Sequence, residues 1–247
     1  MEALTKIPFF KFSATGNDFI LIDNREGIFS GDEIEFFQQI CQRRTSIGAD
    51  GVLLIENSAE CDFRMRYFNA DGSEATCGNG ARSAAFFAHH CGIVNQSAVF
   101  LVQSERYEAE VKGNMVKLKM PVPRDLMTSV DILEEHDLEE GGFVNTGVPH
   151  YVLFGKNIAH IDVDHLGCKY RWHTQFHPEG SNVNFVEVVS QDQIKLRTYE
   201  RGVENETLSC GTGCVASAYL AAINNKTRLP TEVLTSGGRL RVYRDDD

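Results

Sequence analysis

The chain has 247 residues, of which 42% are hydrophobic and 10% aromatic, enough for one large domain or two of ordinary size. Its 35 acidic and 24 basic residues give a formal net charge of −11, which argues against nucleic acid or an anionic membrane as partner, because both need a basic face. No apolar run approaches the roughly 20 residues that span a bilayer, and the N-terminus lacks a signal-peptide pattern. The composition therefore predicts a cytoplasmic protein whose partner is a small molecule.

The first half is predicted to combine short strands with two helices. Ser30 and Glu33 form a capping box before apolar residues at helical spacing, which predicts an amphipathic helix over about 31–43. A polar loop, 69–81, carries Cys77 to the segment 80–90, which is apolar or small on every side and is therefore expected to be a helix inside a domain. The predicted strands are 7–12, 19–22, 52–55, 63–67, 98–103, 106–111 and 115–120.

The second half repeats landmarks of the first in the same order. Thr15-Gly16 before an apolar strand has its counterpart in Thr146-Gly147, and Cys77 has its counterpart in Cys210. A second apolar helix is predicted over 213–223, with strands at 231–235 and 239–243. This pattern predicts an internal duplication and an α/β (α+β) fold of two similar domains, each with a mixed sheet wrapped around a central helix. We place the domains at 1–122 and 123–247, with the boundary in the acidic stretch after Pro121.

Two of the seven cysteines stand in a setting that favours chemistry. Cys77 and Cys210 each precede a helix that begins Gly-Asn-Gly or Gly-Thr-Gly, where free N–H groups and the positive end of the helix dipole lower the pKa of a thiol and bind a carboxylate. If the two halves face one another, one thiolate can remove an α-proton next to a carboxylate while the other thiol delivers a proton from the opposite face. Neither a metal nor pyridoxal is needed. The remaining cysteines form no disulfide framework, and four are expected to be reduced and buried: Cys41, Cys61, Cys91 and Cys168.

Other interpretations of the same residues are weaker. Cys210 and Cys214 do not have the spacing of a usual zinc pair, and His173 and His177 lack the glutamate of a metalloprotease motif, which favours a surface or packing role. The glycines at 211–216 fit a dinucleotide fingerprint only formally, because a long polar loop separates them from the preceding strand. A Cys-His protease stays open, but it leaves the duplication unexplained.

A series of motifs, spread in order over nearly the whole chain, resembles that of the diaminopimelate epimerase family. The motifs are Gly16-Asn17-Asp18-Phe19, Gly48-Ala49-Asp50-Gly51, Tyr67-Phe68-Asn69-Ala70-Asp71-Gly72-Ser73, Cys77-Gly78-Asn79-Gly80-Ala81-Arg82, Pro149-His150, Asn182-Val183-Asn184-Phe185, Glu200-Arg201-Gly202 and Cys210-Gly211-Thr212-Gly213. The resemblance implies two pseudo-symmetric α/β domains. It also implies cofactor-independent interconversion of LL- and meso-2,6-diaminopimelate, in lysine and peptidoglycan precursor synthesis.

The resemblance also implies a role for each site residue. Cys77 and Cys210 would be the acid/base pair, and His150 and Glu200 would tune them. The reacting carboxylate would be held by Gly78, Asn79, Gly211 and Thr212, and the rest of the substrate by Asn17, Asn69, Asn182, Glu200 and Arg201.

Three departures from the family pattern stand out. Val148 occupies a position where the family usually has Asn. The loop 203–207 is one residue longer than usual, which leaves the role of Glu206 open. The family's last strands are absent after Asp247. Two alternative functions stay open: a related racemase for proline or hydroxyproline, with Gly51 and Val148 as the positions where it would differ, and an inactive amino-acid-binding protein. A homodimer stays open as well.

Overall fold

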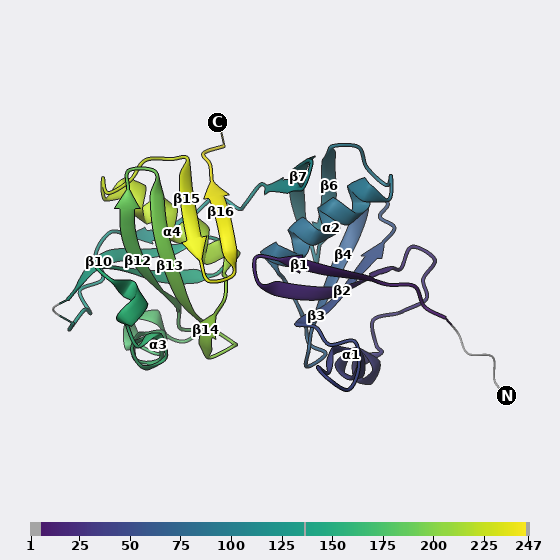
Figure 1. Ribbon diagram of the computed structural model, residues 1–247, viewed down its shortest axis with the longest axis horizontal. Helices are drawn as coiled ribbons and strands as arrows, with labels where there is room; N and C mark the ends of the chain where they lie inside the picture. The colour runs from purple at the N-terminus through teal and green to yellow at the C-terminus, as the bar shows by residue number, and fades with distance from the viewer. Residues whose placement is uncertain (1–5, 136, 246–247) are drawn as a thin grey trace. The chain divides into compact units, whose positions relative to one another are not determined.

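The computed structural model describes residues 6–135 and 137–245, and the chain divides into two compact units between Lys119 and Met120 (Figure 1). Each unit contains an eight-stranded mixed sheet, a helix enclosed by the sheet and a second helix on the outer face. The α/β class with two similar halves, predicted from the sequence, is thereby confirmed. None of the helices in the described ranges is long and apolar enough to cross a membrane.

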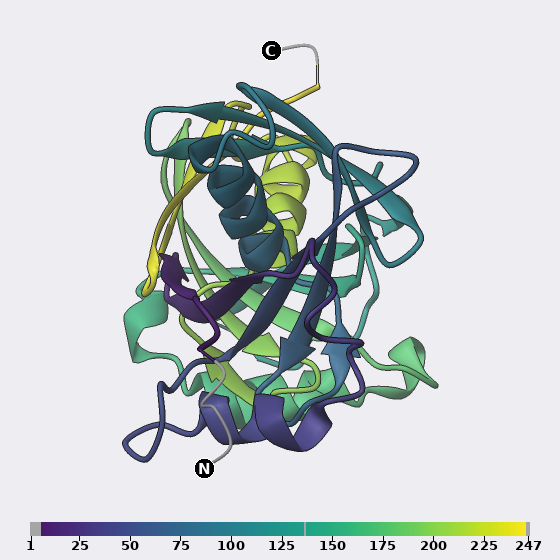
Figure 2. The ribbon, with the colours of Figure 1, turned by 90° about the vertical axis from the view of Figure 1, so that its right-hand side faces the viewer.

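In the first unit the sheet wraps around helix α2. The strand order is β1-β2-β3-β4-β6-β7-β8, with β5 paired to β4, and α2 contacts every strand of that order (Figures 1 and 2). Small side chains on α2, such as Ala81, Ala84 and Ala88, are fully buried and let the strands come close on several sides. The elements are β1 Phe10–Ala14, β2 Asn17–Asp23, α1 Ile34–Cys41, β3 Gly51–Glu56, β4 Phe63–Asn69, β5 Glu74–Ala75, α2 Gly78–His90, β6 Ser97–Val102, β7 Glu105–Lys112 and β8 Met115–Leu118.

The second unit repeats this arrangement around helix α4. Its strand order is β16-β15-β13-β12-β11-β10-β9, with β14 paired to β13. The elements are β9 Arg124–Met127, β10 Leu138–Asn145, β11 Pro149–Gly155, α3 Val163–Arg171, β12 Asn182–Ser190, β13 Gln193–Glu200, β14 Asn205–Thr207, α4 Gly211–Ile223, β15 Thr231–Thr235 and β16 Gly238–Val242, with short 3₁₀ turns at Ile158–His160 and Thr174–Phe176.

Strand register makes the duplication explicit. β2 runs parallel to β3 with Phe19 opposite Gly51, and β11 runs parallel to β12 with His150 opposite Asn182. In the next antiparallel pair, Leu53 lies opposite Tyr67 in the first unit, as Asn184 lies opposite Thr198 in the second. The matched positions are therefore Phe19 with His150, Leu53 with Asn184, and Tyr67 with Thr198.

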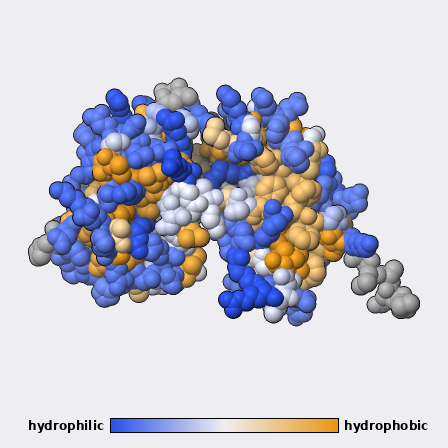
Figure 3. All heavy atoms as spheres, in the orientation of Figure 1, coloured by the Kyte–Doolittle hydropathy of each residue, from blue (hydrophilic) through white to orange (hydrophobic). Residues whose placement is uncertain are grey.

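Hydrophobic side chains form an inner and an outer cluster in each unit. In the first unit, one cluster packs between α2 and the sheet, and another packs under α1 around Phe37 and Phe68, whose ring centroids are 4.7 Å apart. On the face seen in Figure 3, hydrophobic side chains gather over the region of α2 and β1. Phe10 on the edge strand β1 contacts Phe87 at 5.1 Å between ring centroids and is still 42% exposed, so the edge strand covers this side of α2 only in part.

Three sequence predictions about elements were wrong. Helix α1 begins at Ile34 rather than near residue 31, because Gly31 has a left-handed φ of +98° and the Glu33 carboxylate accepts N–H bonds from Ser30 and Gly31 in the preceding loop. The acidic stretch after Pro121, for which no strand was predicted, contains β9 and most of β10. Helix α3 was not predicted either. The predicted strands 106–111 and 115–120 are confirmed as the β7–β8 hairpin, and the predicted helix over 213–223 is confirmed as α4.

The prediction that four cysteines are buried was correct only for Cys41. Cys61 is half-buried. Cys91 and Cys168 are exposed, because Cys91 follows the last residue of α2 and Cys168 lies on the solvent-facing side of α3. None of the seven cysteines forms a disulfide within the described chain.

Candidate functional site

Cys77 is the last residue before helix α2. Its backbone is extended, and its Sγ accepts a hydrogen bond from the Gly80 N–H at 3.4 Å, so the sulfur caps the helix in the way that a serine or aspartate oxygen usually does. The thiol is half-buried. The helix start thus places a sulfur among N–H groups that stabilise negative charge.

A cluster of polar side chains surrounds this end of α2. The Thr15 hydroxyl donates to Asn79 Oδ1 at 3.1 Å, and Asn79 Nδ2 donates to Asn17 Oδ1. Arg82, one turn along the helix, also donates to Asn79 Oδ1. Asn17 and Asn79, both predicted site residues, are therefore in direct contact next to Cys77. Asn69 ends β4 and donates to Ser73 Oγ at 3.0 Å within the loop that leads to Cys77.

Cys210 stands in the same position before α4 but in a more enclosed setting. It is 7% exposed, and its Sγ lies 3.4 Å from the Thr212 hydroxyl. Thr212 is in turn 2.9 Å from His150 Nε2, and its carbonyl accepts from Thr146 Oγ1 at 2.9 Å. His150 therefore reaches Cys210 through Thr212, which differs from the direct contact that a Cys-His protease needs.

The electrostatics around Cys210 correct one sequence prediction. Burial, with a contribution from nearby Glu200, raises the pKa of Cys210 far above its ordinary value, so burial outweighs the helix N-terminus. Burial and the Arg201 charge lower the pKa of His150 to about 3, which keeps the imidazole neutral. Burial also raises the pKa of Glu200, whose carboxylate accepts from the Thr207 hydroxyl at 2.8 Å.

Asn182 and Arg201 meet where β12 and β13 lie side by side. Asn182 Oδ1 accepts from the Arg201 backbone N–H, and its Nδ2 donates to the Pro149 carbonyl, both at 2.8 Å. The Arg201 guanidinium donates to Glu179 at 3.2 Å, and the Glu179 side chain is 73% exposed. Because solvent screens the Arg201–Glu179 ion pair, exchanging Glu179 for another carboxylate would cost little free energy.

Val148 stands beside the start of α4 where the first unit has the polar residue Asn17 beside the start of α2. Thr146-Gly147-Val148 matches Thr15-Gly16-Asn17, but the Val148 side chain is apolar and has no amide to offer; its backbone carbonyl accepts a hydrogen bond from the Thr146 N–H at 3.2 Å. The amide pair seen beside Cys77 is thus not repeated beside Cys210.

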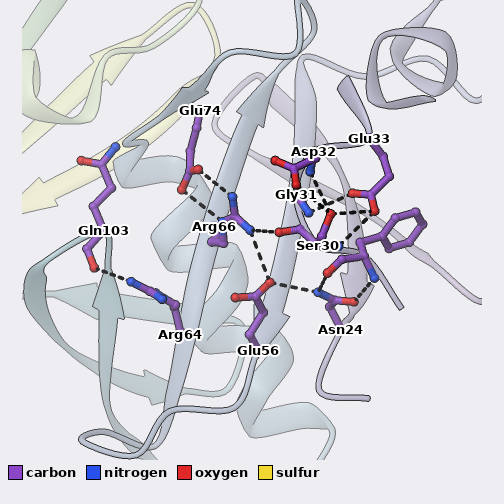
Figure 4. A network of polar contacts seen from close by, with 11 residues as sticks. Asn24, Ser30, Gly31, Asp32, Glu33, Glu56, Arg64, Arg66, Glu74 and Gln103 are labelled. Carbon is purple, nitrogen blue, oxygen red and sulfur yellow. Dashed lines mark hydrogen bonds and ion pairs between the residues drawn. The ribbon is translucent and has the colours of Figure 1, made fainter. Parts of the chain in front are cut away.

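In each unit an arginine–glutamate ion pair links the two strands of the hairpin that precedes the cysteine. Arg66 on β4 pairs with Glu74 on β5 and donates to the Ser30 carbonyl at 2.7 Å (Figure 4). Arg197 on β13 makes two bonds to Glu206, at 2.7 and 2.6 Å, and donates to the Ile158 carbonyl at 2.8 Å. This pairing gives Glu206 a structural role in the longer loop.

The described residues hold no group of three or more His, Cys, Asp or Glu side chains suited to a metal ion. His173 caps a short 3₁₀ turn and His177 lies 3.2 Å from the Trp172 carbonyl, which fits the predicted surface or packing role.

Alkylation should separate the cysteines by exposure and acidity. Because the pKa of Cys210 is raised, its thiol stays protonated at pH 8 and should react with iodoacetamide far more slowly than exposed Cys91 and Cys168, gaining rate only at higher pH. Peptide mass mapping over time measures this order. Labelling of Cys210 as fast as Cys168 at pH 8 would contradict the buried, protonated state.

Comparison with known proteins assigns this arrangement to a family. A model described as diaminopimelate epimerase matches residues 9–124 and 142–247. The chain belongs to the diaminopimelate epimerase family. A relative from Flavobacterium psychrophilum, named diaminopimelate epimerase, is 40% identical over 236 residues, which cover 94% of this chain and 89% of the relative.

Solved structures extend the diaminopimelate epimerase fold to more distant proteins. A phenazine biosynthesis protein of the PhzF family from Bacillus anthracis matches with a TM-score of 0.73 at 15% identity, covering 98% of this chain and 91% of that one. A probable proline racemase from Agrobacterium radiobacter matches with a TM-score of 0.64 at 15% identity, covering 96% and 84%. At such identity these likenesses show the fold alone, so they give no support to the racemase alternative over the family assignment.

Proposed function

We propose that this protein interconverts LL- and meso-2,6-diaminopimelate without a cofactor, using Cys77 and Cys210 as acid and base. Family membership supports the substrate and reaction. The observation that carries the mechanism is that each unit places one cysteine immediately before an enclosed helix, at matching points of a duplicated fold. The halves 1–122 and 123–247 would each contribute one thiol. The substrate of such a reaction is a cytoplasmic precursor of lysine and peptidoglycan.

The reaction is two proton transfers at one carbon. One thiolate takes the α-proton, so that the Cα–H bond breaks and its electron pair remains on the substrate, delocalised toward the carboxylate. The opposite thiol then donates its proton to the other face, forming the inverted Cα–H bond and leaving a thiolate. N–H groups of Gly78, Asn79, Gly211 and Thr212 would hold the carboxylate as its charge grows.

The remaining predicted residues bind the rest of the substrate in this scheme. Asn17, Asn69, Asn182, Glu200 and Arg201 would contact the ammonium groups and the distal carboxylate. The raised pKa of Cys210 supports its role as the protonated partner in the free enzyme, which leaves the role of base to Cys77. The neutral His150 imidazole and the Glu200 carboxyl group would tune Cys210.

The scheme requires both sulfurs to flank one carbon, so in the absence of substrate and reductant an oxidant such as dissolved oxygen should take two electrons and two protons from the thiols and join them as a disulfide. Activity should then depend on reductant, and mass spectrometry of oxidised, inactive enzyme should show a Cys77–Cys210 cross-link. Finding both thiols free, or joined to other cysteines, would refute the facing arrangement.

A substrate panel in D₂O tests the function itself. Loss of the α-proton signal is followed by NMR for LL-diaminopimelate, proline and glutamate. We expect exchange with LL-diaminopimelate alone. Exchange with proline would favour the racemase alternative, and binding without any exchange would favour the inactive binding protein.

A further inference from the structure

A buried line of hydrogen bonds leads to Cys210 from Asn184 and Thr198, neither of which has an assigned role in the sequence analysis, although Asn184 belongs to one of the family-like motifs. Thr198 Oγ1 donates to Asn184 Oδ1 at 3.0 Å, and Asn184 Nδ2 lies 2.9 Å from His150 Nδ1. Asn184 and His150 are fully buried and Thr198 is 2% exposed. From His150 the line continues through Thr212 to Cys210.

The orientation of the Asn184 amide is set by a neighbouring backbone carbonyl, which has only one hydrogen-bonding role. Its Nδ2 lies 3.3 Å from the Tyr151 carbonyl, and a carbonyl can only accept, so the atom that faces it must be the nitrogen. The Thr198 hydroxyl then has to donate to Oδ1. The Tyr151 carbonyl therefore fixes the amide independently of the histidine, and the Thr198 hydroxyl is compatible with that orientation.

The fixed amide determines the tautomer of His150. Because Nδ2–H donates to Nδ1, the neutral ring must carry its proton on Nε2, which then donates to Thr212 Oγ1. A hydroxyl that already accepts this bond directs its own hydrogen elsewhere, and Cys210 Sγ lies 3.4 Å away. The line thus delivers an O–H donor to the sulfur.

The first unit shows that the fold does not require this polarity. The positions that match His150, Asn184 and Thr198 are Phe19, Leu53 and Tyr67, and all three are packed in the hydrophobic core. Phe19 and Tyr67 form an edge-to-face ring contact with centroids 5.8 Å apart. The Tyr67 hydroxyl donates to the Asp50 carbonyl at 3.4 Å, but the contacts at these three positions are mainly apolar. Since one half of the duplication folds in this way, the buried polar residues of the other half serve a different requirement.

The start of α4 is fitted closely to the same residues. A Cβ on Gly213 would lie 2.6 Å from Asn184 Oδ1 and 3.3 Å from His150 Cε1, so only glycine allows the helix end to approach. At the matching Gly80, the nearest atom is the tip of the Leu53 side chain at 3.0 Å.

We propose that Asn184 and Thr198 are positioning residues which hold His150 as the Nε2–H tautomer and thereby aim the Thr212 hydroxyl at Cys210, stabilising its thiolate during turnover. This role rests on the proposed epimerase function. Asn184 would fix the tautomer and ring orientation of His150, as the hydrogen-bonded partner of a catalytic histidine does in other enzymes.

The test pairs activity with a direct reading of the tautomer. Asn184→Leu installs the residue that the first unit has at this position, so the protein should fold. With ¹⁵N-labelled histidine, long-range ¹H–¹⁵N NMR should show only Nε2–H for His150 in the wild type and a mixture, or Nδ1–H, in the variant. The kcat for LL-diaminopimelate should fall about 10- to 100-fold with little change in KM.

Thr198→Val provides a second variant of nearly unchanged shape. It should lower kcat in the same way, and Thr198→Ser, which keeps the hydroxyl, should restore most of the loss. Thr227→Val is the matched control, because Thr227 Oγ1 is buried in the same unit with no hydrogen-bond partner in the described chain, and its removal should leave kcat unchanged.

The proposal is overturned if wild-type His150 carries its proton on Nδ1, or if Asn184→Leu and Thr198→Val both retain kcat within about threefold of the wild type. A wild type that turns over no amino acid would refute the proposed function instead, while the NMR spectra would still decide whether Asn184 sets the tautomer.

Discussion

Replacing Cys77 or Cys210 by alanine is expected to abolish net epimerisation of LL-diaminopimelate. Each variant removes the base for one epimer and the acid for the other, so kcat/KM should fall in both directions by on the order of 10²–10⁴ or more. Without that thiol, no group on one face of the α-carbon can remove or deliver the proton. The measurement is the rate of meso product formation by NMR or coupled chromatography.

Cys168→Ala is the matched control, since Cys168 is an exposed free thiol in the second unit outside the proposed site. Its activity should stay at the wild-type level. If either Cys77→Ala or Cys210→Ala retained near-wild-type epimerisation, the two-cysteine mechanism would be untenable.

Arg201→Lys is expected to impair turnover of diaminopimelate severely and to change little for an amino acid without a distal carboxylate. A lysine ammonium cannot reproduce the planar fork that binds a carboxylate through two bonds. Sites built around a polar group of the substrate reject analogues lacking that group by about 10⁴-fold, so wild-type kcat/KM for lysine should be lower than for diaminopimelate by that order.

The comparison is kcat/KM for diaminopimelate and for lysine in both proteins. Glu179→Gln is a second informative variant, because it removes the carboxylate paired with Arg201 in the free chain. It should lower the KM for diaminopimelate slightly. Equal losses on the two substrates in Arg201→Lys, or no loss on diaminopimelate, would remove Arg201 from the distal pocket.

Local signals made the helix ends predictable from the sequence. Gly-polar-Gly after each cysteine specifies a helix start, and the apolar segments behind Cys77 and Cys210 specify enclosed helices, which the structure confirms at Gly78 and Gly211. The strands that were missed, β9 and β10, lie at one edge of their sheet and carry acidic residues, so they lack the alternating apolar pattern of a core strand.

Properties that depend on packing were not predictable from the sequence. The helix N-terminus alone predicts an acidic Cys210, but burial reverses that expectation, and burial is set by residues distant in the chain. Asn184 and Thr198 stand in strands that look apolar, and only strand register brings them to His150. A sequence comparison of the two halves would have revealed them, since their counterparts are Leu53 and Tyr67.

The isotopic content of the first product formed in D₂O tests the two-cysteine mechanism most directly. If separate thiols act on the two faces, the abstracted proton stays on one sulfur while the other delivers solvent deuterium. At low conversion of LL-diaminopimelate, the meso product should therefore carry deuterium at the inverted carbon, and the remaining substrate should keep its α-hydrogen. Product that retains protium at that carbon, or substrate that exchanges as fast as product forms, would contradict the mechanism.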